Sequence, residues 1–385
     1  MMRKLLYIAN QRLPSEKAYG RQMVKMCEAF ADLGWEVELV VPRRGHLADE
    51  DLFDFYSIRR NFKFTQISSP DWYWPGQLDR FAFWIKNFIS ARKLARYALK
   101  GNYDLIYSRD EWPTYFLLRS AKKIIFEAHK YIRSYFFLYA YFKKRDLSIV
   151  AITHGLKNKL TQKGFRPENI LVAPDGVDAE KLKQQTSAPL NKEEARSKLN
   201  LPRHQKIAVY TGSLYKWKGV FVLAEAAKLL KDEATTIVAV GGGPSSDQVE
   251  LQNYLNQNQI KNFLITGYVA DPTTRDLYRA AADVLVLPNT SKDKISEVYT
   301  SPLKLFSYMA SNRPVVASNL PSLGEVLNEK NAVLVKPDDA TALSVGIKKV
   351  FADPKSSALL SEQAFQDVQK YTWEKRSSII AGLMK

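Results

Sequence analysis

The sequence predicts an α/β protein made of two domains, each containing a doubly wound parallel sheet. Short apolar runs of strand length alternate along the chain with longer stretches of helical periodicity, the order expected of βαβ units. At 385 residues the chain is too long for one ordinary core. The polar stretch 183–205 interrupts the alternation, so we place the linker there, between domains at 1–185 and 186–365.

The first domain opens with a βαβ unit, and the elements that follow it keep the same alternation. Strands are predicted at 5–9, 37–41, 64–67, 105–107, 124–127, 149–152 and 170–173, and helices at 21–33, 78–99, 113–120 and 156–163. Gly20 lies where the first loop meets the first helix, and a glycine there lets a ligand approach the backbone closely. A plain loop glycine explains the same residue equally well.

The second domain repeats this pattern. Strands are predicted at 207–211, 236–240, 263–266, 284–287 and 315–317, and helices at 220–231, 246–257, 273–281 and 302–310. If two parallel-sheet domains face each other, a ligand is expected in the cleft between them, outside the carboxyl ends of the strands.

A loop rich in glycine and lysine follows the first strand of the second domain. Residues 212–219 read GSLYKWKG, so two glycines bracket Lys216 and Lys218 at a strand-to-helix turn. A flexible backbone with two cations suits a bound diphosphate, whereas a solvated loop with surface lysines is the alternative. A second glycine cluster at 241–244 is a weak signal by itself, because glycines also form plain turns.

The stretch 297–318 carries a second candidate anion site. Ser301 and Pro302 lead into the helix at 302–310, whose first N–H groups are unpaired and whose dipole is positive at that end. An ordinary helix–strand unit is the alternative for this segment alone. The lysine loop upstream favours the anion site.

Charge and cysteine content limit the classes of partner and compartment. The formal net charge is +17 and the pI about 9.6, which indicates an acidic partner: a nucleotide diphosphate, an anionic lipid surface or nucleic acid. One cysteine, Cys27, allows no intrachain disulfide and fits a reducing cytoplasm. We expect neither a signal peptide nor a membrane-spanning segment, because no apolar run is long enough.

Taken in order, these motifs resemble the family-4 (group 1) retaining glycosyltransferases of the GT-B fold, in which two Rossmann-like domains face across a cleft. The resemblance covers nearly the whole chain and rests on residues 14–34, 174–178, 212–219, 241–244, 281–288, 302–310, 314–317 and 371–374. It implies that 186–365 binds the nucleotide sugar, that 1–185 faces the acceptor, and that 366–385 is a helix crossing back to the first domain.

The resemblance also implies the site residues. Lys218 matches the lysine that pairs with the donor diphosphate, and His129 matches the histidine that contacts the donor sugar, although a structural loop histidine is the alternative. Glu297 lies two residues from Tyr299, the position of the first motif glutamate, and is its expected substitute. The expected catalytic residues are His129, Lys218 and Glu297. The expected donor-binding residues are Gly20, Gly212, Ser213, Lys216, Gly243, Tyr268, Val269, Tyr299, Ser301, Pro302, Leu303, Lys304 and Ser307.

Two departures from the family pattern keep a second interpretation open. Ser213 stands where an arginine is usual, and Ser307 stands where the second motif glutamate binds the ribose hydroxyls. A hydroxyl offers one such hydrogen bond where a carboxylate accepts two. The alternative to an active enzyme is therefore a degenerate nucleotide-sugar-binding protein. A nucleic-acid binder is motivated by charge alone, with no supporting motif.

The implied reaction is a retaining hexosyl transfer to an acceptor hydroxyl, in surface polysaccharide or glycolipid synthesis. No protein nucleophile is assigned and no metal is expected to be required, because we interpret the acidic triplet at 49–51 as solvated surface. Expected partners are a nucleotide-diphosphate sugar and a glycan or lipid-linked acceptor. Aromatic segments with basic flanks at 72–74, 81–89 and 135–145 suit an anionic membrane at the inner face of the plasma membrane, or else core helices.

Overall fold

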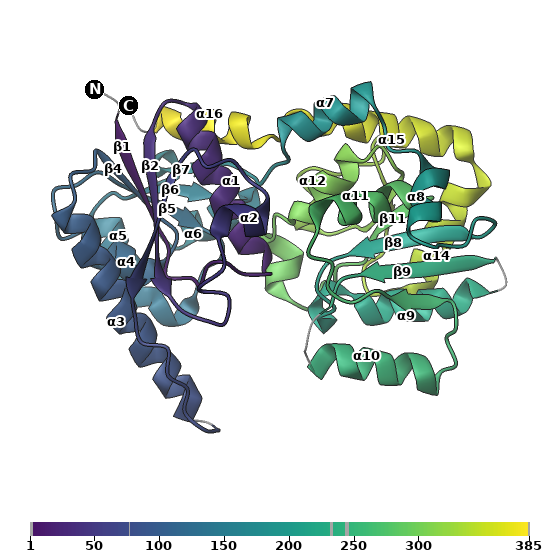
Figure 1. Cartoon of the computed structure of the whole chain (residues 1–385), viewed down its shortest axis with the longest axis horizontal. Coiled ribbons are helices and arrows are strands. Elements are labelled where there is room, and N and C mark those ends of the chain that lie inside the picture. Colours follow the sequence, from purple (N-terminus) through teal and green to yellow (C-terminus); the bar gives the residue numbers. More distant parts are fainter. Residues whose placement is uncertain (1–2, 77, 232–233, 243–245, 384–385) are drawn as a thin grey trace. The chain divides into compact units, whose positions relative to one another are not determined.

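A computed structural model describes residues 3–76, 78–231, 234–242 and 246–383. The chain divides into two compact units (Figure 1): unit 1 is Met1–Pro174 with Trp373–Lys385, and unit 2 is Asp175–Thr372. Each unit is an α/β domain with one parallel sheet and helices on both of its faces, as the alternation of the sequence predicted.

The sheet of unit 1 has seven parallel strands in the order β3-β2-β1-β4-β5-β6-β7. Their bounds are β1 Lys4–Ile8, β2 Glu36–Arg43, β3 Lys63–Ser68, β4 Leu105–Ser108, β5 Ile124–Ala128, β6 Ser148–Ala151 and β7 Ile170–Val172. Leu5 aligns with Val37 on one side and Leu105 on the other, which places the reversal of strand order between β1 and β4. Loops that leave the carboxyl ends on either side of this reversal diverge and leave room for a ligand.

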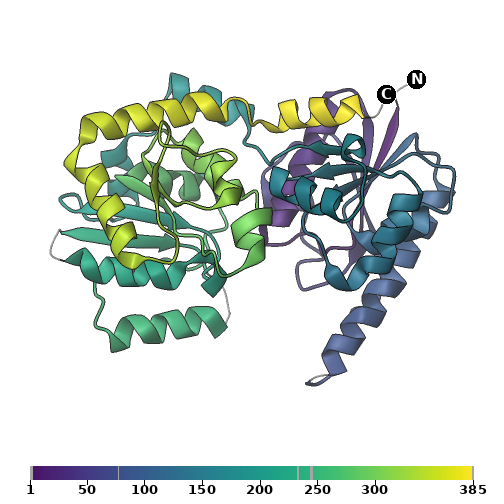
Figure 2. The same ribbon diagram turned by 180° about the vertical axis from the view of Figure 1, so that it is seen from behind.

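The helices of unit 1 surround this sheet. They are α1 Ala18–Asp32, α2 Leu52–Tyr56, α3 Leu78–Lys100, α4 Glu111–Leu117, α5 Phe136–Lys144, α6 His154–Gln162 and α16 Trp373–Gly382, with 3-10 turns η1 Arg133–Tyr135 and η2 Pro167–Asn169. α1 presents Met23, Cys27 and Phe30 to the core with no exposed surface. α16 returns from the end of the chain to pack beside α1 (Figures 1 and 2), where the Ser377 hydroxyl reaches the Ala29 carbonyl at 3.5 Å.

The sheet of unit 2 has six parallel strands in the order β10-β9-β8-β11-β12-β13. These are β8 Lys206–Thr211, β9 Thr235–Val240, β10 Phe263–Ile265, β11 Val284–Leu287, β12 Val315–Ser318 and β13 Val333–Val335. The helices are α7 Ala179–Ser187, α8 Lys192–Lys198, α9 Val220–Leu229, α10 Ser246–Gln257, α11 Pro272–Ala281, α12 Leu303–Ala310, α13 Pro321–Gly324, α14 Ala340–Ala352 and α15 Pro354–Val368. The strand order reverses between β8 and β11, so the loops that follow these two strands border the expected ligand position.

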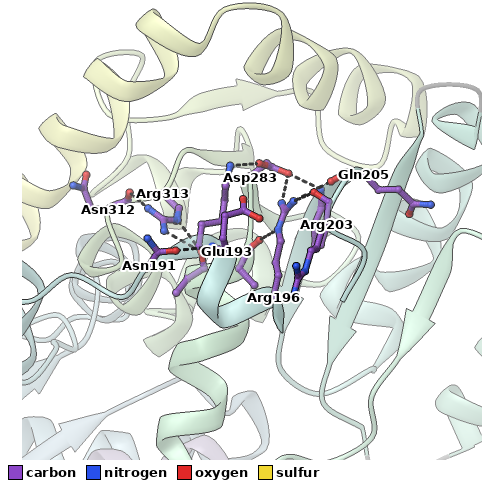
Figure 3. Close-up of polar contacts among 12 residues, drawn as sticks. Asn191, Glu193, Arg196, Arg203, Gln205, Asp283, Asn312 and Arg313 are labelled. Carbon is purple, nitrogen blue, oxygen red and sulfur yellow. Dashed lines mark hydrogen bonds and ion pairs between the residues drawn. The ribbon is translucent and has the colours of Figure 1, made fainter. Parts of the chain in front are cut away.

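The division between the units lies earlier than the linker predicted at 183–205. Much of that polar stretch folds as α7 and α8, which belong to unit 2. Arg196 of α8 is 3% exposed and donates to the Asp283 carboxylate at 2.6 Å and to the Ala281 carbonyl at 3.0 Å (Figure 3). Lys192 reaches the same carboxylate at 3.0 Å. The charges that suggested a free linker therefore anchor a helix to β11.

Candidate functional site

The loop between β8 and α9 is held in a geometry that only glycine can supply at its ends. Gly212 and Gly219 have φ values of +134° and +79°. A Cβ on Gly219 would lie 1.6 Å from the Pro288 carbonyl oxygen, so this residue contacts the backbone just after β11 directly. Between the two glycines, Lys216–Lys218 forms a 3-10 turn (η3). The loop therefore stays at the carboxyl edge of the sheet, beside the reversal of strand order.

The helix α12 is fixed against the same edge by a buried tyrosine. The Thr211 N–H, at the end of β8, donates to the Tyr308 hydroxyl at 2.6 Å, and Tyr308 has no exposed surface. α12 begins after Pro302 without a side-chain cap. The Leu305 N–H already donates to the Pro302 carbonyl at 2.9 Å, which leaves the N–H groups of Leu303 and Lys304 at the positive end of the helix dipole.

Lys304, in the first turn of α12, holds a buried cation. Its Nζ lies 3.8 Å from the centroid of the Tyr210 ring, and this nitrogen is buried with no hydrogen-bond partner in the described part of the chain. Burial lowers the pKa of Lys304 well below its usual value, and the positive charge of Lys218 lowers it further. A buried ammonium that lacks a carboxylate is costly unless an anion joins it.

Lys218 provides the second cation. Its Nζ lies 3.6 Å from the centroid of the Trp217 ring, and burial lowers its pKa to about 8 despite the opposing charge of Asp293. The positive charge of Lys218 disfavours a second charge on Lys304, and a bound polyanion would relieve this repulsion. Residues 212–219 and the start of α12, the two candidate anion sites of the sequence, thus come together in unit 2.

Two of the other expected donor-binding residues in the lysine loop are engaged elsewhere. Lys216 pairs with Glu250 of α10 at 2.6 Å, and this pair raises the pKa of the lysine. Ser213 is exposed, and its backbone carbonyl accepts a hydrogen bond from the Tyr210 hydroxyl at 2.7 Å. Gly243 lies outside the described residues.

The residues that precede α12 form a π-helical turn, η5 Ile295–Tyr299, which contains Glu297 and Tyr299. Lys294 forms an ion pair with the Glu297 carboxylate at 2.5 Å. Ser301 accepts from the Asp175 N–H at 3.0 Å, and Leu303 is the first residue of α12. The Ser307 hydroxyl donates back to the Leu303 carbonyl at 3.1 Å, so it is turned toward its own helix.

Tyr268 and Val269 follow β10 at the same edge of the sheet. Tyr268 is 44% exposed, whereas Val269 packs against the core and accepts from Arg275 through its carbonyl at 3.2 Å. In unit 1, Gly20 lies in the first turn of α1, where a Cβ would overlap the Tyr56 hydroxyl at 1.9 Å. Close packing with Tyr56 therefore explains the glycine at position 20 without a ligand.

His129 lies just after β5 in unit 1, next to a carboxylate with no exposed surface. Its Nε2 is 2.6 Å from Oε1 of Glu127, which also accepts from Gln22 at 2.7 Å and faces Arg376 at 3.4 Å. Burial alone would raise the pKa of Glu127, but the charge of Arg376, the hydrogen bond from His129 and the charge of Arg109 hold it well below its usual value. The Tyr107 hydroxyl donates to the second oxygen of the same carboxylate.

Both ring nitrogens of His129 have neighbours. Arg109 lies 3.4 Å from Nδ1, and because a guanidinium only donates, we assign the proton of the neutral ring to Nε2, which donates to Glu127. Burial, followed by the charge of Arg109, lowers the pKa of His129 to about 4. His129 is therefore a neutral, oriented imidazole at neutral pH.

Sequence reasoning missed Glu127, Arg109 and Arg376. Glu127 and His129 are two residues apart where a strand ends, a spacing that places both side chains on one face and was available as a signal. No local signal marks Arg376, which reaches Glu127 because α16 returns to unit 1 from the far end of the chain.

Two residues of the acidic triplet at 49–51 have structural roles. Asp51 caps α2 by accepting from the Phe53 and Asp54 N–H groups at 2.9 Å, and Asp49 pairs with Arg43. Across the described ranges, no three His, Cys, Asp or Glu side chains gather in a way that could hold a metal ion. Among the same residues, no helix has the length and hydropathy to span a membrane.

Two family models match most of the chain. The model for "Glycosyltransferase Family 4" matches residues 20–181, and the model for "Glycosyl transferases group 1" matches residues 205–353. Both halves of the chain therefore resemble the group 1 glycosyltransferases. The second matched range contains both Lys218 and Lys304, and the first contains His129.

The curated relatives share about a quarter of their residues with this chain over the matched range. TuaC of Bacillus subtilis (strain 168), a glycosyltransferase named for teichuronic acid biosynthesis, is 27% identical over 221 residues, or 57% of this chain and 51% of TuaC. The chain spans about half the length of the curated relatives it matches.

Solved structures share the GT-B fold over nearly the whole chain. A glycosyltransferase from Rickettsia africae ESF-5 has a TM-score of 0.77 at 17% identity, covering 100% of this chain and 98% of that one. Anabaena Alr3699/HepE in complex with UDP has a TM-score of 0.76 at 16% identity, covering 99% of each chain. At these identities the likeness establishes the fold alone.

Proposed function

We propose that the protein is a retaining glycosyltransferase that moves a hexosyl group from a nucleotide-diphosphate sugar to an acceptor hydroxyl. The observation that carries the proposal is the pair Lys218 and Lys304, two like charges beside the start of α12. A diphosphate supplies the two negative charges that this arrangement lacks. Neutral ligands would leave the ammonium of Lys304 buried and without a partner.

In the proposed reaction the bond between the anomeric carbon and the diphosphate oxygen breaks, and its electron pair leaves with the diphosphate. The acceptor oxygen bonds to the same face of the anomeric carbon, and its proton passes to the leaving phosphate. Lys218, Lys304 and the N–H groups that open α12 stabilise the negative charge that develops on the diphosphate. No protein nucleophile takes part.

His129 is proposed to contact the donor sugar from unit 1. A neutral ring can hydrogen-bond a sugar hydroxyl, but each of its nitrogens already has a neighbour. The sugar would replace Arg109 at Nδ1, since that contact is the longer of the two. Glu297 is proposed as a further site residue, which requires it to leave its ion pair with Lys294.

The two lysines of the site could take the place of a metal ion. Lys218 and Lys304 provide positive charge at the place where a divalent cation would otherwise neutralise a diphosphate. We therefore propose that the reaction needs no metal ion, in which case EDTA leaves the rate unchanged. A rate that falls with EDTA and returns with added Mg²⁺ would contradict this.

The biological setting is proposed from the relatives. TuaC is named for teichuronic acid biosynthesis, and the E. coli relative WcaI for colanic acid biosynthesis, so surface polysaccharide or glycolipid synthesis is the proposed process. The acceptor is then a growing glycan or a lipid-linked sugar. The proposed location is the cytoplasm, at the inner face of the plasma membrane.

A catalytically silent nucleotide-sugar-binding protein is the second candidate. Ser307 favours it, because its hydroxyl is turned to the Leu303 carbonyl and no carboxylate stands at this position to bind a ribose. The two candidates share the diphosphate site and differ in turnover.

The deciding experiment uses thermal shift and product release together. UDP heads the panel because the Anabaena neighbour was solved with it, followed by GDP, ADP and the corresponding nucleotide sugars. A diphosphate is expected to raise the melting temperature while the matching nucleoside does not. Lys218→Ala is expected to lower nucleotide release from the preferred sugar at least about tenfold with the fold retained. If no diphosphate shifts the wild-type melting temperature, the proposed site is wrong; binding without turnover identifies the second candidate.

A further inference from the structure

One face of unit 1 exposes large apolar side chains instead of burying them. We call this set the aromatic surface; its members are Trp74, Leu78, Phe81, Trp84, Phe136 and Phe137. Phe81 is 61% exposed and Phe136 68% exposed, values far from those of core residues. From the sequence, these segments could be either core helices or an interfacial surface. Their exposure favours the interfacial surface.

Helix α3 displays its part of the aromatic surface as a continuous stripe. Leu78, Phe81 and Trp84 follow one another at intervals of three residues, which brings them onto one side of the helix. Ala82 and Lys86, on another side, are buried. In both views the first half of α3 extends away from the rest of unit 1 (Figures 1 and 2).

Ring contacts join the aromatic surface across several elements. Trp84 of α3 lies 5.7 Å from Tyr135 of η1, and Phe137 of α5 lies 5.8 Å from Trp112 of α4, measured between ring centroids. Trp74 packs beside Phe81 at 6.4 Å, which ties the preceding loop to the start of α3. The rings therefore form two groups, one at the start of α3 and one over η1, α4 and α5, and α3 carries members of both.

Unpaired cations surround the aromatic surface. Arg80 lies on α3, Arg119 just beyond α4, Arg133 on η1, and Lys144 and Arg145 at the end of α5, all exposed. Within the described residues, none of these five side chains forms an ion pair with a carboxylate. Arg119 and Arg145 instead lie over tyrosine rings, at 5.1 and 5.2 Å from the ring centroids.

We propose that the aromatic surface docks unit 1 onto an anionic lipid bilayer. Exposed tryptophan and phenylalanine side chains insert at the boundary between headgroups and acyl chains, while a cationic rim binds lipid phosphates. The inference deepens the proposed function, because docking would bring unit 1 to the bilayer that presents a lipid-linked acceptor. It does not require that function, since lipid binding is measured separately from turnover.

Charge favours a bilayer over a second copy of this chain. A two-fold contact through the aromatic surface would bring two identical cationic rims together. The whole chain carries a formal charge of +17, so such a pair would also repel at longer range. An anionic bilayer can both bury the apolar side chains and bind the cations around them.

The test is flotation of the purified full chain with vesicles of phosphatidylcholine, alone or with added phosphatidylglycerol. The chain is expected to float with the phosphatidylglycerol vesicles, less so at high salt, and poorly with phosphatidylcholine alone. The double variant Phe81→Ser/Trp84→Ser is expected to lose this binding. Its matched control is Ile379→Ser, which removes an apolar side chain that is 53% exposed elsewhere on unit 1.

A second pair of variants tests the rim. Arg133→Glu/Arg145→Glu is expected to lower partitioning to phosphatidylglycerol vesicles by about fivefold or more for each cation reversed. The control Lys355→Glu reverses an exposed charge on α15 of unit 2 and is expected to bind as the wild type does. Lys218→Ala should bind vesicles normally whatever it does to turnover, which separates this inference from the proposed function.

Three results would overturn the inference. The wild-type chain could fail to float with anionic vesicles, or Phe81→Ser/Trp84→Ser could float as well as the wild type. Light scattering could also show a wild-type dimer that the same double variant converts to a monomer without any vesicle binding, which would assign the surface to self-association.

Discussion

Oε1 of Glu127 lies 2.6 Å from Nε2 of His129, in a network that joins β5 to the C-terminal helix through Arg376. Glu127 has no exposed surface, and its negative charge is balanced by Arg376 and Arg109. The imidazole beside it stays neutral because burial and Arg109 lower the pKa of His129 to about 4. The histidine is thereby held in one tautomer and one orientation.

This relationship predicts acid sensitivity of the folded chain. An unfolded histidine has a pKa near 6.5, so between about pH 6.5 and pH 4 the unfolded state binds more protons than the folded state at His129. The free energy of unfolding should therefore fall as the pH is lowered through this window, by roughly 3 kcal/mol from this residue. Urea titrations monitored by circular dichroism at several pH values measure it.

The variant His129→Gln removes the titrating ring and is expected to flatten this pH dependence. His204→Gln is the matched control, because His204 lies in an exposed turn of unit 2. An unchanged pH profile in His129→Gln would show that the acid sensitivity comes from other groups, such as Glu127 below its own pKa.

The fold could be predicted from the sequence because strand and helix periodicities are local signals. β8 and α10 illustrate this, since an apolar run and a helical pattern predicted both within a residue. The linker could not be predicted in the same way. Arg196 looks like a surface charge in the sequence, and its burial against Asp283 is set by tertiary packing.

In the candidate site, too, some features could be predicted from local motifs and others depend on tertiary packing. The Gly212–Gly219 loop and the start of α12 were both visible as sequence motifs, and their position at one sheet edge follows from strand order. The ring of Tyr210 under Lys304, and the return of Arg376 to Glu127, join residues about ninety and two hundred and fifty positions apart. No periodicity or spacing encodes such pairs.

The buried ammonium of Lys304 predicts opposite effects on stability and on binding. Lys304→Met keeps the length of the side chain and removes its charge, so the free energy of unfolding of the ligand-free chain should rise by about 1 kcal/mol. Affinity for UDP should fall at least about tenfold, because one of the two cations is lost. Urea unfolding and calorimetric titration measure the two quantities.

Lys355→Met is the control for this prediction. Lys355 is exposed on α15, so its replacement is expected to change neither quantity appreciably. A Lys304→Met chain that is both less stable and fully able to bind UDP would mean that the ammonium is satisfied within the protein and takes no part in the site.

Lys218 predicts how diphosphate binding depends on pH. Its pKa in the free chain is about 8, and a bound diphosphate should raise it, so binding takes up a proton above that pH. Titration of Lys218 is therefore expected to leave UDP affinity nearly constant below about pH 8. Above that pH it is expected to lower the affinity by up to about tenfold per pH unit. The phosphates of UDP lose their last proton near about pH 6, outside this range.

Calorimetric titrations between neutral and alkaline pH, repeated in buffers of different ionisation enthalpy, measure both the affinity and the protons taken up. Lys218→Arg keeps a charge that does not titrate in this range, and its affinity should lose the alkaline decline. A decline that persists unchanged in Lys218→Arg would assign it to another group and remove Lys218 from contact with the diphosphate.

Ser307 predicts a gain of function. Its hydroxyl donates to the Leu303 carbonyl one turn earlier, so the present side chain offers little to a ribose placed beside α12. Ser307→Glu would present two acceptor oxygens from the same helical position, and a charge-assisted hydrogen bond contributes about 1.5–3 kcal/mol. UDP affinity should rise by at least about tenfold.

Ser307→Gln, which has the same length as Ser307→Glu and no charge, should gain much less affinity. Titration calorimetry with UDP and with a ribose-free diphosphate separates the effects, because the gain must vanish when the ribose is absent. Equal affinities in wild type and Ser307→Glu would place the ribose away from α12, even if the diphosphate still binds at Lys218 and Lys304.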